Sequence, residues 1–136
     1  MGMYTELYVK AVFKENLPND VVNIIKYMLG MGDIKVEDLK LPDHELFKTP
    51  RWECMLRSSS HYHIPFALNK FIYNEISEKY FLVARADFKN YNGEIEKFFD
   101  WLKPYLQREF DKTLIGYSLY EVDTEPNLYY LEGINE

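Results

Sequence analysis

The sequence predicts an α+β fold in a single domain, residues 1–136, built from two repeated strand–helix–strand–strand (βαββ) units. Two observations predict it. Tyr8–Lys14 reads YVKAVFK and Val83–Lys89 reads VARADFK, and a similar amphipathic run follows each segment at one constant offset. The repeat-like halves cover about residues 3–75 and 79–132. We expect a mainly antiparallel sheet of about six strands with two helices on one face.

In the first half, apolar residues alternate over positions 7–13, which is the period of a half-buried strand. Pro18 suits the first turn of a helix. Apolar side chains within residues 21–29 then recur at helical spacing and form one stripe. Residues 52–59 and 66–73 are predicted to form two further strands, because their polar and apolar positions also alternate.

The second half repeats this order. Residues 82–88 alternate like a strand, and Asn92 suits the N-cap of the helix that follows. Pro104 should end or kink that helix, because proline lacks the N–H that a helix interior needs. Strands are predicted over residues 114–122 and 128–131, separated by a turn.

Alternation also assigns the two faces of the sheet. Ala11 and Ala86 should lie under the helices, whereas Lys10 and Arg85 occupy equivalent places on the opposite face. With 17% aromatic residues in the chain, tyrosines should gather on that second face, where one end of the ring remains wet. The residues expected to bind a ligand there are Tyr8, Lys10, Arg57, Arg85, Tyr117 and Tyr129.

Only the first half carries a long connection, residues 30–51, and loops of that length tend to be functional or mobile. All three histidines, His44, His61 and His63, lie within or soon after it. They are weak candidates for zinc or iron ligands, because His-x-His is a loose pattern and the third ligand is not defined. A hydrolase that uses a serine of residues 58–60 with His61 is a further alternative, although no glycines flank these serines.

Composition excludes several classes. The net charge of −6 argues against nucleic acid and anionic membranes as partners, since both attract Lys and Arg. We expect neither a membrane span nor a signal peptide, because no apolar run is long enough. The single cysteine, Cys54, cannot form an internal disulfide, which fits a reducing cytoplasm. No cofactor motif appears, so none is expected.

The doubled unit resembles the architecture of GyrI-like and SOUL-type domains. That resemblance implies a small ligand, often hydrophobic or cationic, held between the two halves, and it assigns no residue of this chain to a site. The segments TPRWECMLRSSSHY and YNGEIEKFFDWLKPYL also resemble uncharacterised small bacterial proteins, some of them phage-borne. This second resemblance implies no mechanism.

The sequence therefore favours a non-enzymatic, cytoplasmic binding domain. We expect a small or extended ligand on the tyrosine-rich sheet face and the insertion at residues 30–51. The alternative is a protein-interaction module, either a homodimer or a phage-encoded inhibitor of a host protein. A metal-dependent or serine hydrolase that uses residues 43–63 is the third interpretation.

Overall fold

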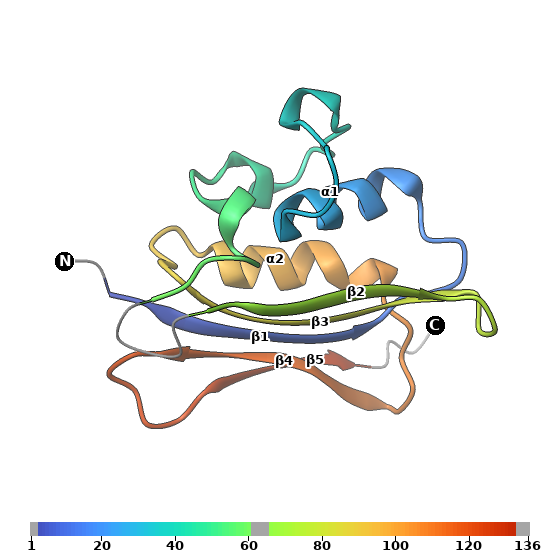
Figure 1. The fold of residues 1–136 in the computed structure, drawn as a ribbon. Helices are drawn as coiled ribbons and strands as arrows, with labels where there is room; N and C mark the ends of the chain where they lie inside the picture. Colours follow the sequence, from blue (N-terminus) through green and yellow to red (C-terminus); the bar gives the residue numbers. More distant parts are fainter. Residues whose placement is uncertain (1–2, 61–65, 133–136) are drawn as a thin grey trace.

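The computed structural model describes residues 3–60 and 66–132, and the fold is α+β as predicted. An antiparallel sheet has the strand order β2-β3-β1-β4-β5, and two helices lie on one of its faces (Figure 1). The strands are Thr5–Val12 (β1), Leu68–Asn74 (β2), Lys79–Phe88 (β3), Lys112–Tyr120 (β4) and Asn127–Glu132 (β5). The helices are Asn19–Leu29 (α1) and Glu94–Leu102 (α2). Short 3₁₀ turns are Val36–Asp38 (η1), Glu45–Lys48 (η2), Trp52–Cys54 (η3) and Lys103–Tyr105 (η4).

The elements from β1 to β4 follow the β-α-β-β-α-β order of split βαβ folds, if the 3₁₀ turns are set aside. β1 and β3 lie side by side at the centre of the sheet, and β5 extends it beyond β4. The two helices start at Asn19 and Glu94, at the offset that also relates the YVKAVFK and VARADFK segments. The origin of the two halves from one duplicated unit stays a prediction.

The strand predicted over residues 52–59 is wrong, so the described sheet has five strands instead of about six. Trp52, Cys54 and Leu56 alternate in the sequence, but the buried residues are Trp52, Met55 and Leu56. That spacing of three and four residues is helical, and residues 52–54 form η3. The first half is therefore β-α-β, and only the second half has the complete βαββ order.

The core lies between the sheet and the helices. Phenylalanines 13, 88, 98 and 99 are among its largest fully buried side chains. Ala11 and Ala86 are buried on the helix side, as predicted, and their small size permits close packing. Gly116 in β4 lies directly under Phe99, where a Cβ atom would come within 2.6 Å of the ring. Among the described residues, no helix is long and apolar enough to cross a membrane.

Residues 30–51 lie on the helices, on the side away from the sheet (Figure 1). Phe47 anchors this insertion, because its ring packs edge-on against Trp52 at 4.9 Å and Trp101 at 5.3 Å between ring centroids. The insertion thus builds a third layer over α1 and α2.

Candidate functional site on the open face of the sheet

The face of the sheet opposite α1 and α2 carries one row of paired residues that crosses all the described strands. The strand registers align Tyr8 of β1 with Arg85 of β3 on one side and with Tyr117 of β4 on the other. Arg85 in turn pairs with Leu68 of β2, and Tyr117 pairs with Leu128 of β5. Paired residues share a face of a sheet. We call this surface the open face and these five residues the central row.

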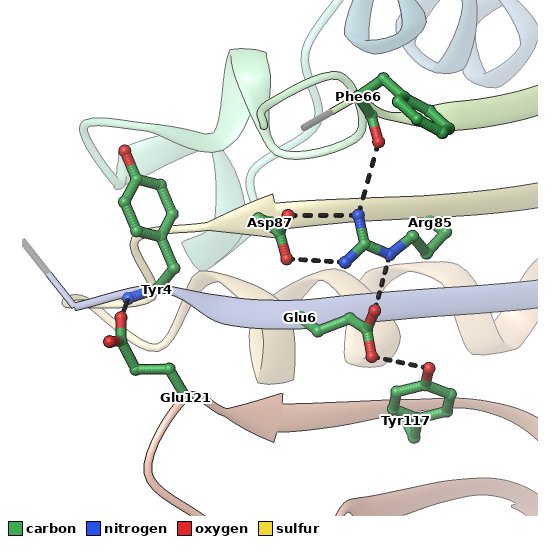
Figure 2. Close-up of polar contacts among 7 residues, drawn as sticks. All are labelled: Tyr4, Glu6, Phe66, Arg85, Asp87, Tyr117 and Glu121. Atoms are coloured by element: carbon green, nitrogen blue, oxygen red, sulfur yellow. Dashed lines mark hydrogen bonds and ion pairs between the residues drawn. The ribbon is translucent and has the colours of Figure 1, made fainter. Parts of the chain in front are cut away.

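Arg85 is the hub of a polar network on the open face (Figure 2). Its Nε donates to Glu6 Oε2 at 2.6 Å, and its two terminal nitrogens donate to Asp87 Oδ1 and Oδ2 at 3.0 and 3.1 Å. Nη1 also donates to the backbone carbonyl of Phe66 at 3.4 Å. Tyr117 completes the network, because its hydroxyl donates to the second carboxylate oxygen of Glu6 at 2.8 Å.

Burial makes this network a fixed part of the fold. Arg85 is 9% exposed and Asp87 is 0% exposed. Burial disfavours the charged guanidinium, but the hydrogen bond to Glu6 and the charge of Asp87 outweigh it, so the pKa of Arg85 is raised. Burial and the hydrogen bond to Glu6 also raise the pKa of Tyr117 to about 12. The tyrosine is therefore a neutral donor at physiological pH.

The charges of the network decide what the face can bind. Among the described residues of the network, one guanidinium and two carboxylates leave one negative charge in excess. Arg85 and Lys10 were both predicted to bind a ligand on this face, but Arg85 already donates to both carboxylates. Lys10 lies two residues after Tyr8 on β1, where it pairs with Val83 and its side chain is exposed. Among these groups, no arrangement favours a shared anion.

Aromatic and aliphatic side chains surround the network. The rings of Tyr8 and Tyr117 stack, with centroids 5.3 Å apart and planes 23° apart. Leu68, Val83 and Leu128 are 57%, 47% and 48% exposed on the same face. Contiguous exposed apolar surface of this kind marks an interaction site more often than a single exposed leucine does.

Two residues predicted for this face lie elsewhere. Arg57 is on the helix side, where its Nη1 donates to the carbonyl of Tyr27 at the end of α1 and its guanidinium lies 5.9 Å from the Tyr27 ring centroid. Tyr129 pairs with Gly116 and stacks on Phe99 at 4.2 Å between centroids, so it also faces the helices. The alternation argument failed for Tyr129 because a β-bulge in β4 between Leu114 and Gly116 shifts the register of β5.

The insertion and the open face do not meet. Residues 30–51 cover the helices, so a site that combines this loop with the tyrosine-rich face is not formed (Figure 1). The chain reaches the open face later, where Asp87 N donates to the carbonyl of Ser58 at 3.1 Å and Phe66 accepts from Arg85. Ser58 and Phe66, which lie outside the insertion, are described loop residues that hydrogen-bond to the polar network.

The histidine predictions have separate outcomes. His44 caps η2, because its Nδ1 accepts from Leu46 N at 3.0 Å while its Nε2 lies 2.9 Å from Asp100 Oδ2. Both ring nitrogens are thus engaged in hydrogen bonds, and the described residues contain no group of three potential metal ligands. His61 and His63 lie outside the described residues, so of the serine–histidine pair predicted for a hydrolase the structure describes only the serines, within residues 58–60.

Sequence reasoning missed Glu6 and Asp87, which hold Arg85 in place. A signal was available: each lies two residues from a predicted site residue, Glu6 from Tyr8 and Asp87 from Arg85. Two-residue spacing places side chains on the same face of a strand. The alternation that selected Arg85 therefore also selects both of its carboxylate partners.

Comparisons of the chain with models of protein families, with curated proteins and with solved structures found no match.

Proposed function

We propose that this chain is a non-enzymatic binding domain whose open face docks an extended ligand, namely a segment or surface of a partner protein. The observation that supports this most is the central row, in which Arg85 and the stacked pair Tyr8 and Tyr117 lie between exposed leucines on one continuous face. Arginine and tyrosine in the middle of an apolar patch are typical of protein interfaces.

The size of the face favours a polypeptide over a small molecule. Four interstrand spacings of about 4.8 Å and strands of about seven residues give a face of roughly 19 by 23 Å. Its flat area of roughly 440 Å² is about half of the ~800 Å² that each partner buries in a standard protein interface, which suits a docked peptide segment. Small-molecule sites are instead concave and enclose most of their ligand.

The polar network contributes rigidity and charge selection. Arg85, Glu6 and Asp87 hold one another, so the centre of the face is ordered before a partner arrives. A preorganised surface loses less entropy on binding. The excess negative charge favours a partner segment that is neutral or basic at this point.

The test is a selection of peptides from a random phage-displayed library on the immobilised protein, followed by affinity measurement. Val83→Glu and Leu128→Glu place a charge on the open face, and we expect each to weaken the selected peptides at least tenfold. Ile76→Glu is the matched control, because Ile76 is 97% exposed in the β2–β3 turn, away from the central row. Equal affinities of the open-face variants and the control would contradict the proposal.

Self-association is the second candidate, and one observation favours it. Glu6 and Lys10 lie on β1 at equal distances on either side of Tyr8. A twofold axis along the central row would bring the acidic network of one copy over Lys10 of the other. Under this candidate, light scattering shows a dimer that Lys10→Glu dissociates and Ile76→Glu does not. A monomer at all concentrations excludes it and leaves the docking of a different partner in place.

A further inference from the structure

A hollow lies between η4 and β5, on a different part of the molecule from the central row of the open face. Its volume is about 980 Å³, and it follows β5 from Leu128 to Glu132. Leu106, which is 2% exposed, and the half-buried Leu131 contribute apolar surface to its lining. The hollow is therefore long, partly apolar and parallel to a strand.

Three cations line this hollow. Lys14 follows β1, Lys103 belongs to η4, and Arg108 lies in the connection to β4. Among the described residues that line the hollow, Glu132 is the only acid, and its carboxylate already lies 3.8 Å from Lys112. In a chain of net charge −6, three cations around one hollow with one paired acid form a local reversal of charge.

The three cationic side chains have no polar partner within the described part of the chain. The side chains of Lys14, Lys103 and Arg108 make no hydrogen bond or ion pair with any residue of 3–60 or 66–132. Lysines often guard a free sheet edge, but here the three cations come from the segments opposite the strand and not from β5 itself. Their positions suit a ligand that lies between them and β5.

β5 supplies the other half of the recognition. It is the last strand of the sheet among the described residues, so its outer backbone N–H and C=O groups have no neighbouring strand there. An added strand can hydrogen-bond such an edge, and pockets beside the edge then select its side chains. Five residues of β5 line the hollow, which corresponds to an extended segment of about 16 Å.

We propose that this hollow binds an acidic peptide in extended conformation, with its backbone along β5 and its carboxylates on Lys14, Lys103 and Arg108. Alternate residues of an extended chain point to one side, so every second residue of the peptide is acidic and the intervening ones are apolar. This site is separate from the central row of the open face. A negative result for either proposal therefore leaves the other one unaffected.

The test uses a fluorescein-labelled six-residue peptide of alternating Glu and Val, with fluorescence anisotropy as the readout. We expect saturable binding that weakens as salt increases, because the contacts are ionic. The K14A/K103A/R108A variant should bind at least tenfold more weakly. K26A/K40A/K70A is the matched control, because it also removes three cations but none that lines the hollow. Each triple variant replaces three long, positively charged side chains with alanine, so the two variants change charge and size alike. Circular dichroism checks that both variants stay folded.

A second peptide separates an extended peptide from a small anion. The same sequence with every backbone nitrogen methylated has no N–H group left to donate to β5, and we expect it to bind at least tenfold more weakly. Equal binding of this peptide, or full competition by free glutamate at similar concentration, would overturn the peptide in favour of a small carboxylate. Absence of saturable binding, or equal losses in the two triple variants, would overturn the site altogether.

Discussion

At the scale of single residues, the clearest result is that Arg85 has a structural role that its sequence position does not reveal. A strand arginine among tyrosines resembles a ligand-binding residue, and it was predicted as one. The structure shows it nearly buried and bonded to two carboxylates. A substitution here therefore affects the fold as well as any ligand.

Arg85→Ala should destabilise the protein by about 3–5 kcal/mol, because it removes the guanidinium that pairs with the buried carboxylate of Asp87. Arg57→Ala is the matched control, since that arginine is exposed at the end of α1. We expect the control to cost no more than about 1 kcal/mol. Urea unfolding followed by circular dichroism measures both, and equal midpoints for the two variants would rule out the structural role.

Tyr117 gives the fold a dependence on alkaline pH. Burial and Glu6 favour the protonated hydroxyl, so its pKa rises from the ordinary tyrosine value of 10.0 to about 12 in the folded protein. Its contribution to stability is therefore complete below pH 10 and is lost as pH rises through about 12. The unfolding free energy of the parent should fall more steeply over this range than that of Tyr117→Phe.

The comparison of parent and variant removes the effects of other tyrosines, which both proteins share. Tyr73→Phe serves as a control, because that ring is 46% exposed in β2. This variant controls for the removal of a phenol hydroxyl from the sheet. Identical slopes for the parent and Tyr117→Phe would show that Glu6 does not hold the hydroxyl in solution.

At the scale of elements, close packing of α2 on the sheet depends on a glycine in β4. A Cβ at Gly116 would overlap the carbonyl oxygen of Tyr8 and approach Cζ of Phe99 to 2.6 Å. Gly116→Ala should therefore destabilise the protein by about 1–3 kcal/mol or more, since neither backbone nor ring moves without cost. Thermal unfolding measures the loss.

Gly32→Ala separates this packing effect from the general cost of replacing glycine. No atom lies within 4 Å of a Cβ at Gly32, so only its positive φ of 72° opposes the substitution. We expect a smaller loss than at Gly116. A Gly116→Ala protein as stable as Gly32→Ala would mean that α2 shifts away from the sheet at little cost.

The helices and the long strands could be predicted from periodicity, and the places where prediction failed have identifiable causes. Residues 52–56 show both a two-residue and a three-to-four-residue apolar spacing, and the helical one prevails because Met55 is buried. At the start of α2, Asn92 was predicted as the cap, but Gly93 occupies the N-cap position and Asn90 Oδ1 accepts from Ile95 N. Local sequence signals do not decide between such neighbouring candidates.

At the scale of the whole molecule, the sequence could not show on which side of the sheet the insertion lies. Periodicity assigns faces within a strand, but it gives no information on a loop whose regular elements are two short 3₁₀ turns, η1 and η2. Phe47 holds the insertion on the helix side, because its ring packs against Trp52 and Trp101. The contact with Trp101 joins segments that are far apart in the sequence. The open face is consequently free of the insertion.

This layered arrangement predicts a gradient of local stability. β1 pairs with β3 and β4, and β3 pairs with β1 and β2, so the backbone groups of both central strands are bonded on two sides. Residues 31–42 contribute mostly exposed side chains and only local turns such as η1. Amide hydrogen exchange should be slowest in β1 and β3, and fastest in residues 31–42.

Mass spectrometry of peptides after deuterium labelling measures this gradient. The expected cause of the slow exchange in β1 and β3 is that each strand is hydrogen-bonded on both sides. β5 is the internal control, because it belongs to the same sheet and, among the described strands, pairs only with β4. It should exchange faster than β1 but slower than residues 31–42. Protection of residues 31–42 equal to that of β1 would mean that the insertion unfolds only with the core, and the layers would then form one cooperative unit.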